Sequence, residues 1–147
     1  MKKILIAVTL FLAAQSAIAQ SDAEKDLKVL ITVGGKKLTA TLQNNAASRD
    51  LIAQLPVQIH ATDYNGAEKI GKLPKPLSTA GAPAGSDPES GDIAFYAPWG
   101  NLVFYYGEVG YWPGIVHLGH LDGGSQPFSG SDALDITVER ADATPSK

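Results

Sequence analysis

Short runs of alternating apolar residues, separated by glycine, proline and asparagine, constrain this chain more than any other feature of its sequence. The first two runs, at residues 28–33 and 36–42, are separated by Gly34-Gly35. This pair suits a two-residue hairpin turn, because both of its residues tolerate positive φ. A period of two over four to eight residues indicates a strand with one buried face. Further strand-like runs begin at Val57, Lys69, Ile93, Leu102, Gly114 and Leu134. About eight short strands predict a mainly β fold, a closed or nearly closed eight-stranded β-barrel.

One segment between these runs has the period of a helix instead. Ala47, Leu51 and Leu55 recur at a spacing of four, which places them on one face of about three helical turns. Asn44 or Asn45 can cap its start by accepting a hydrogen bond from a free backbone N–H, and Pro56 ends it. We expect this one main α-helix to cover an opening of the barrel.

The first nineteen residues have the tripartite pattern of a secretory signal peptide. Lys2 and Lys3 precede an apolar run over residues 4–14, and Ala17 and Ala19 place small side chains at the positions that a signal peptidase reads, before a cleavage site at Gln20. The apolar run is shorter than the roughly 20 residues that span a bilayer, although an uncleaved anchor is the alternative. The pattern predicts a secreted or periplasmic protein. We expect a signal peptide at 1–19, a flexible segment at 20–27, one domain at 28–141 and a disordered tail at 142–147.

The composition of the mature chain limits its structure and its partners. It has about 128 residues and no cysteine, so its core alone must stabilise it, which is feasible at this length. Without Lys2 and Lys3, ten scattered basic residues face fifteen acidic ones. Phosphate binding needs clustered Lys and Arg, so we expect no nucleic-acid partner. No second apolar stretch reaches membrane length, so we expect no membrane partner after cleavage, while the oligomeric state stays open.

Chemical motifs are scarce in this sequence. His117 and His120 are three residues apart, and in a strand an odd spacing places side chains on opposite faces, where they cannot chelate one ion. No nucleophile elbow and no phosphate-binding glycine loop is present. We therefore predict no metal and no cofactor, and we identify no catalytic residue. One of the two histidines, His117, is a candidate to line a pocket.

Aromatic side chains are concentrated in one part of the sequence. Eight of the ten aromatic residues of the mature chain lie between Phe95 and Trp112. Trp99 falls in a turn over residues 98–101, and Tyr111 with Trp112 falls in a second predicted turn over 111–114. Rings in turns favour recognition, because rigid amphipathic rings give contact area at a small entropic cost. The alternative is that both tryptophans cap the ends of the barrel.

A proline- and glycine-rich stretch over residues 74–91 has no period at all. Loops this long are uncommon inside a compact domain and often form a lid or the rim of a site. A solvated connector is the alternative interpretation.

Several motifs resemble those of small bacterial cyclophilin-like domain proteins over about residues 28–140. They are TLQNNAAS at 41–48, ATDYNG at 61–66, KLP at 72–74, GD at 91–92 and FYAPWGNL at 95–102. The resemblance implies an eight-stranded cyclophilin-type barrel. Prolyl isomerases of this fold use an arginine on the strand after the first helix, with a phenylalanine and a glutamine close behind. The corresponding residues here, 57–62, contain neither arginine nor phenylalanine, and Arg49 and Arg140 lie elsewhere.

Two functional hypotheses follow from these observations. The first is an exported, non-catalytic binding module, in which a concave face rimmed by residues 75–90 receives an extended peptide or a small apolar ligand. Its candidate ligand-binding residues are Tyr96, Trp99, Tyr106, Tyr111 and Trp112, with His117. The alternative is a weak peptidyl-prolyl isomerase, in which Gln58 or His60 replaces the missing donor. A hydrolase has no motif in its favour.

Overall fold

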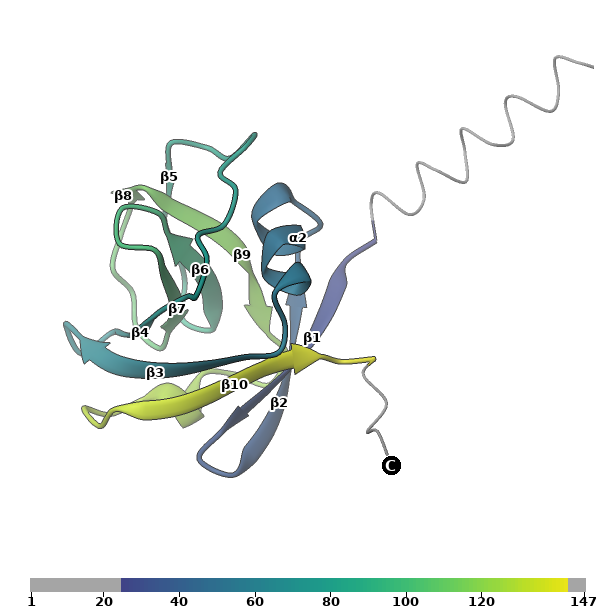
Figure 1. The fold of residues 1–147 in the computed structure, drawn as a ribbon. Helices are drawn as coiled ribbons and strands as arrows, with labels where there is room; N and C mark the ends of the chain where they lie inside the picture. The colour runs from purple at the N-terminus through teal and green to yellow at the C-terminus, as the bar shows by residue number, and fades with distance from the viewer. Residues whose placement is uncertain (1–24, 143–147) are drawn as a thin grey trace, which may run out of the picture.

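Eight antiparallel strands close into a barrel in the computed structural model, which describes residues 25–142 (Figure 1). Around the barrel the hydrogen-bonded order is β1-β10-β3-β4-β7-β6-β9-β2, and β2 pairs with β1 to complete the ring. The predicted closed barrel is confirmed. Its strands are β1 (Leu27–Val33), β2 (Lys36–Leu42), β3 (Val57–Tyr64), β4 (Glu68–Lys72), β6 (Asp92–Tyr96), β7 (Asn101–Tyr105), β9 (Ile115–Leu121) and β10 (Leu134–Arg140).

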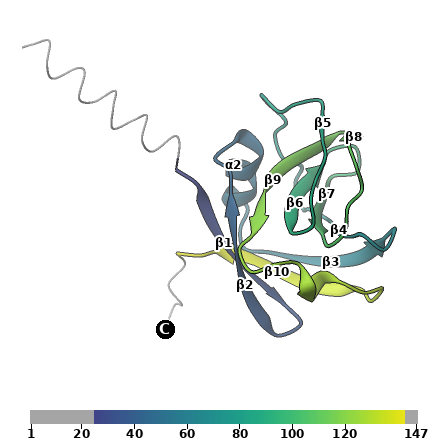
Figure 2. The same ribbon diagram turned by 180° about the vertical axis from the view of Figure 1, so that it is seen from behind.

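The hairpins form where the sequence places residues that accept positive φ. Gly34 and Gly35, at φ values of 56° and 75°, connect β1 to β2, and Asn65 with Gly66, at 55° and 61°, connect β3 to β4. Both connections have the conformation that suits the twist of an antiparallel pair. The predicted signal peptide and residues 143–147 of the predicted tail lie outside the described residues. The two ends of the domain lie side by side, because Val29 of β1 pairs with Arg140 of β10 (Figure 2).

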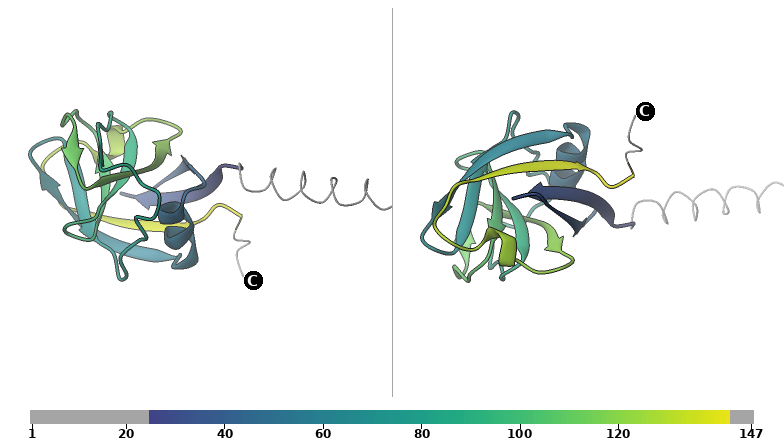
Figure 3. Two further views of the ribbon diagram at one scale, coloured as in Figure 1. Left: turned by 90° about the horizontal axis from the view of Figure 1, so that it is seen from above. Right: turned by 90° about the horizontal axis from the view of Figure 1, so that it is seen from below.

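The helix α2 (Ala46–Ala53) lies at one end of the barrel, next to β9 (Figures 1 and 3). The side chain of Asn45 caps it by accepting a hydrogen bond from the backbone N–H of Ser48 at 2.8 Å. Ala47 and Leu51 are buried in the barrel core, as their spacing predicts. The helix is shorter than predicted, because it has eight residues and ends before Leu55. At the η1 turn (Gln126–Phe128), Phe128 stacks on Phe104 in the same core, with ring centroids 4.8 Å apart. Within residues 25–142 no helix is long and apolar enough to cross a bilayer.

A second apolar cluster lies apart from the main core and explains why β7 is apolar on both faces. Its buried members are Ala94, Val103, Tyr105 and Ile115, and Tyr96 and Val109 pack against it. Alternate residues of β6 and β7 belong to the main core instead, including Phe95 and Phe104. Phe95 and Phe104 are therefore buried in the main core, whereas Tyr105 is buried in the second cluster.

A two-stranded sheet formed by β5 (Gly85–Ser86) and β8 (Trp112–Pro113) adds to the barrel. The prediction of a simple turn over residues 111–114 is wrong here, because Trp112 and Pro113 pair with the long loop. Gly85 permits this pairing: a Cβ at that position would lie 2.4 Å from the carbonyl oxygen of Trp112. The long loop over residues 74–91 is thereby tied to the segment that carries Trp112.

Candidate functional site

Two tryptophans from separate segments line one hollow of about 260 Å³ on the barrel surface, called here the aromatic pocket. Trp99 comes from the β6–β7 turn and Trp112 from β8. The two rings are 46% and 58% exposed, so neither is a buried plug. The lining residues are Tyr64, Asn65, Glu68, Tyr96, Trp99, Tyr105, Val109, Trp112 and Ile115.

Trp99 holds a central place among the rings of the aromatic pocket. Its indole meets the ring of Tyr64 edge-on at 5.6 Å and that of Tyr96 edge-on at 5.1 Å, with interplanar angles of 80° and 84°. Edge-to-face packing is favourable because the positive edge of one ring meets the negative face of the other. The turn is fixed by hydrogen bonds from the N–H groups of Trp99 and Gly100 to the carbonyl of Tyr96, with Gly100 at φ 68°. These contacts form one wall of the aromatic pocket.

Glu68 is the one ionisable carboxylate that lines the aromatic pocket. Across the sheet it lies opposite Tyr64 on β3 and Tyr105 on β7, so its side chain is flanked by two phenol rings. It makes no hydrogen bond or ion pair with any residue from 25 to 142. Burial, together with repulsion from Asp63, raises the pKa of Glu68 to about 7. Burial and the nearby Glu68 charge also raise the pKa of Tyr105 above its usual range.

Tyr106, a predicted ligand residue, belongs to a different and self-contained network. Its hydroxyl donates a hydrogen bond to Asp63, and its ring lies 5.5 Å from the ammonium of Lys69. The Lys69 side chain is fully buried; its Nζ lies 3.0 Å from Oδ1 of Asp63 and also donates to the carbonyl of Gly130. The hydrogen bonds from Tyr106 and Lys69 lower the pKa of Asp63, and the Asp63 bond raises the pKa of Tyr106 to about 12.

Sequence reasoning missed both Glu68 and the Lys69 network, although the hairpin contained the signal. A turn centred on Asn65-Gly66 sets the register that places Asp63 opposite Lys69. Since the side-chain period of a strand is two, Lys69 then points to the face opposite that of Glu68. A lysine on the inward face, with an aspartate directly across the hairpin, is the pattern that indicates a buried pair.

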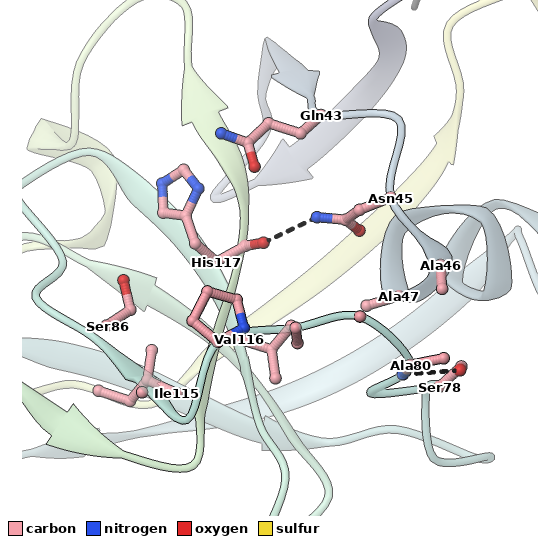
Figure 4. A pocket seen from close by; sticks show the side chains of 14 residues that line it. Gln43, Asn45, Ala46, Ala47, Ser78, Ala80, Ser86, Ile115, Val116 and His117 are labelled. Atoms are coloured by element: carbon pink, nitrogen blue, oxygen red, sulfur yellow. Dashed lines mark hydrogen bonds between the residues drawn. The ribbon is translucent and has the colours of Figure 1, made fainter. Parts of the chain in front are cut away.

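The long loop rims a second hollow, of about 440 Å³, rather than the aromatic pocket (Figure 4). Residues 78, 80–83, 85 and 86 line one side of this loop-rimmed hollow, and the start of α2 and β9 line the other. The loop is anchored, because its Ser78 N–H donates to Asp50 at 2.7 Å and Gln54 donates to the carbonyl of Lys75 at 3.2 Å. Ile115 lines both hollows, so they are neighbours.

His117 lines the loop-rimmed hollow, and its relation to His120 corrects the prediction from spacing. Both imidazoles contact the carboxylate of Asp92: Nε2 of His117 lies 3.3 Å and Nδ1 of His120 lies 2.7 Å from its oxygens. The expectation that they face opposite sides of the strand is therefore wrong. Ile93 pairs with Gly119 and Ala94 with His117, so Leu118 is an extra residue that breaks the alternation.

Asp92 is the shared acceptor of this group. Burial opposes its ionisation, but hydrogen bonds from His120 and the Glu89 N–H, with the nearby His117, outweigh burial and lower the pKa of Asp92. Within the described residues no group of three or more His, Cys, Asp or Glu side chains has the arrangement to hold a metal ion. The contacts fit a group that fixes β9 against β6.

The remaining candidate residues lie outside both hollows. Gln58 and His60 are exposed on β3, and the imidazole of His60 lies 2.8 Å from Asp135 on the neighbouring strand. Tyr111 is 58% exposed, with its hydroxyl next to Gly85. Of the eight predicted ligand residues, the structure therefore brings Tyr96, Trp99 and Trp112 together in the aromatic pocket.

The fold and the comparison with known proteins agree. The model of the Cyclophilin-like family matches residues 31–139. The chain belongs to the cyclophilin-like family. No match to it is found among curated proteins. Its fold is similar to the solution structure of the hypothetical protein AF2241 from Archaeoglobus fulgidus, with a TM-score of 0.58 and 16% identity over 79% of this chain and 95% of that one. At this identity the likeness shows the fold alone, and function has to be argued from the site.

Proposed function

We propose that this cyclophilin-like domain is an exported, non-catalytic binding module that holds a small ligand in the aromatic pocket. The observation that carries the proposal is that Trp99 of the β6–β7 turn and Trp112 of β8 line the same hollow. Concave sites with aromatic walls and a few polar groups are typical of ligand binding. The export part of the proposal rests on the sequence pattern of residues 1–19.

The size of the aromatic pocket limits what it can hold. At about 260 Å³ it lies just below the range of roughly 300–1,000 Å³ that is usual for drug-sized ligands. It has room for a small molecule, or for one side chain of an extended peptide. The partly exposed rings of Tyr64, Trp99 and Trp112 would lose apolar surface to water on binding, which favours association.

The make-up of the pocket supports a binding role over prolyl isomerisation. The resemblance implies that an isomerase of this fold needs a cationic donor beside the peptide bond, because a twisting amide loses resonance and its nitrogen lone pair can then accept a hydrogen bond. Among the described residues no lysine, arginine or histidine lines the aromatic pocket. Gln58 and His60, the candidate replacements, lie outside it on the exposed face of β3.

The two tryptophans, which are the only ones in the chain, allow a direct test. Small soluble fragments, neutral and charged, are titrated while the two indole N–H signals are followed in ¹⁵N-correlated NMR spectra. We expect at least one fragment to shift both signals in a saturable way, and Trp99→Ala to abolish its binding. Tyr111→Ala, which removes another exposed ring that lies outside the pocket, is the matched control and should bind the fragment as the wild type does.

If no fragment shifts either indole signal, or if Tyr111→Ala weakens binding as much as Trp99→Ala does, the proposed binding function is rejected. A coupled assay on a proline peptide tests the non-catalytic part. We expect cis/trans isomerisation of the proline peptide bond to be no faster than the uncatalysed reaction, which takes tens to hundreds of seconds at 25 °C. A protein-dependent acceleration that His60→Ala removes would establish the isomerase instead.

A further inference from the structure

The described residues that line the aromatic pocket present negative charge and negative potential and no positive charge. Five of its nine lining residues are aromatic, and the only ionisable carboxylate among them is Glu68. The faces of Trp and Tyr rings carry negative potential and attract cations, most strongly where water is displaced. Asp63 adds a further negative charge close enough to raise the pKa of Glu68. A cation is therefore the kind of charge that this pocket favours.

The lack of a partner for Glu68 is a second, independent observation. A half-buried carboxylate normally gains a hydrogen bond or a cation, because desolvation without compensation is costly. Glu68 has neither among residues 25–142, while the basic side chain next to it in sequence, Lys69, is fully buried and bound to Asp63. The fold thus has a cation close by in sequence but directs it away from Glu68.

We infer, building on the binding function proposed above, that the aromatic pocket is a site for a small organic ammonium ion. Glu68 is its counter-ion, and the rings of Tyr64, Tyr96, Trp99 and Trp112 surround its alkyl groups. An ammonium ion with alkyl substituents satisfies both parts of the site: its charge pairs with the carboxylate, and its carbon atoms contact the rings. An anion would be repelled by Glu68, and a neutral apolar molecule would bury this carboxylate without compensation.

The decisive experiment compares two molecules of nearly the same shape. Choline and 3,3-dimethylbutan-1-ol differ in that a charged nitrogen in the first is a neutral carbon in the second. Both are titrated into the wild-type domain at pH 8.5, where Glu68 is ionised, with the indole N–H signals as the readout. We expect choline to bind with a Kd at least about tenfold lower than that of the alcohol.

Variants of the domain identify the source of that preference. Glu68→Gln keeps the shape of the side chain and removes its charge, so it should raise the Kd for choline about tenfold. The Kd for the alcohol should stay the same or fall, because no charged carboxylate is then buried beside it. Glu108→Gln, an exposed carboxylate outside the pocket, is the matched control and should leave both Kd values unchanged. Trp99→Ala should weaken both ligands, because the ring contacts both.

The possible outcomes separate this inference from the binding function on which it rests. Equal Kd values for choline and the alcohol, both sensitive to Trp99→Ala, overturn the ammonium site and leave an apolar binding pocket. A preference for choline that survives Glu68→Gln overturns the role of Glu68 as counter-ion. If neither molecule shifts the indole signals while another fragment does, the ammonium site is rejected and the binding function stands.

Discussion

Glu68 and Lys69 are neighbours on β4, but only the charge of Lys69 is paired within the barrel. Lys69 points inward, is fully buried, and its ammonium is bound by Asp63 and the carbonyl of Gly130, beside the ring of Tyr106. Glu68 points to the other face, into the aromatic pocket, and has no partner among residues 25–142. The fold supplies a counter-ion for Lys69, but no residue from 25 to 142 supplies one for Glu68.

Under the proposed function, this contrast separates a structural role for Lys69 from a binding role for Glu68 within a single strand. A buried ion pair whose remaining hydrogen bonds are satisfied contributes to a unique structure, and removing one partner exposes the cost of burying the other. A partly buried charge without a partner destabilises the fold, and such groups concentrate at functional sites. The two side chains should therefore respond in opposite directions to mutation.

The largest effect is expected from Lys69→Ala. The substitution removes a fully buried side chain and deprives Asp63 and the Gly130 carbonyl of their donor. We expect the free energy of unfolding to fall by about 3 kcal/mol, measured by urea denaturation. Lys72→Ala, on the same strand but exposed, is the control and should stay within about 0.5 kcal/mol of the wild type. A wild-type midpoint for Lys69→Ala would refute the structural role of this network.

Glu68→Gln should change stability in the opposite direction and depend on pH. Because burial raises the pKa of Glu68 from 4.5 to about 7, the folded state binds the proton more tightly than the unfolded state does. Ionisation of Glu68 therefore leaves the free energy of unfolding unchanged below pH 4.5. It lowers this free energy increasingly between pH 4.5 and 7, and by its full amount above pH 7. At pH 8 we expect Glu68→Gln to stabilise the domain by about 1–2 kcal/mol, a figure reduced for screening by solvent.

The measurement is urea denaturation of wild type and Glu68→Gln at pH 4 and pH 8. The stabilisation should be absent at pH 4, where Glu68 is protonated in both states. Glu108→Gln should show no such difference at either pH, because its side chain is exposed. A Glu68→Gln variant that is less stable than the wild type at pH 8 would mean that the carboxylate has a stabilising partner.

The smallest effect on stability is expected at the pocket rim. Trp112 is 58% exposed, so Trp112→Ala removes little buried surface, and the free energy of unfolding should fall by less than about 1 kcal/mol. The same substitution should abolish the binding of any ligand that shifts the indole signals. Thermal unfolding and the NMR titration check the two parts. A large loss of stability would show that the Trp112 ring has a structural role, as the Lys69 side chain does.

Local sequence signals predicted the parts of this fold that local interactions determine. The Gly34-Gly35 hairpin, the helix capped by Asn45 and the Trp99 turn depend on residues within a few positions of one another. The closed barrel followed from the number and spacing of the strands and from the family resemblance. All of these features can be predicted without knowing the order of the strands in the barrel.

The missed features depend on contacts between distant segments. Leu118 is an extra residue only in the pairing of β9 with β6, so the sequence of β9 alone does not reveal it. Gly85–Ser86 and Trp112–Pro113 pair as strands of two residues each, which are too short to show an alternating pattern. The sequence identifies Trp99 and Trp112 as candidate ligand residues, but only the fold shows that they line one pocket. The sequence pattern predicts a strand that begins at Lys69, one residue later than β4, so it assigns no face of the sheet to Glu68.

The most direct test of the account is the titration of the Glu68 carboxyl itself, followed by ¹³C NMR of its side chain between pH 4 and 9. Asp63, Tyr64, Tyr96 and Tyr105 are the ionisable groups around it, and assignment through Glu68→Gln identifies its signal. We predict a pKa of about 7 in the free protein and a clear decrease in the presence of choline. A pKa near 4.5 that choline does not change would contradict the account, because Glu68 would then be an ordinary solvated carboxylate.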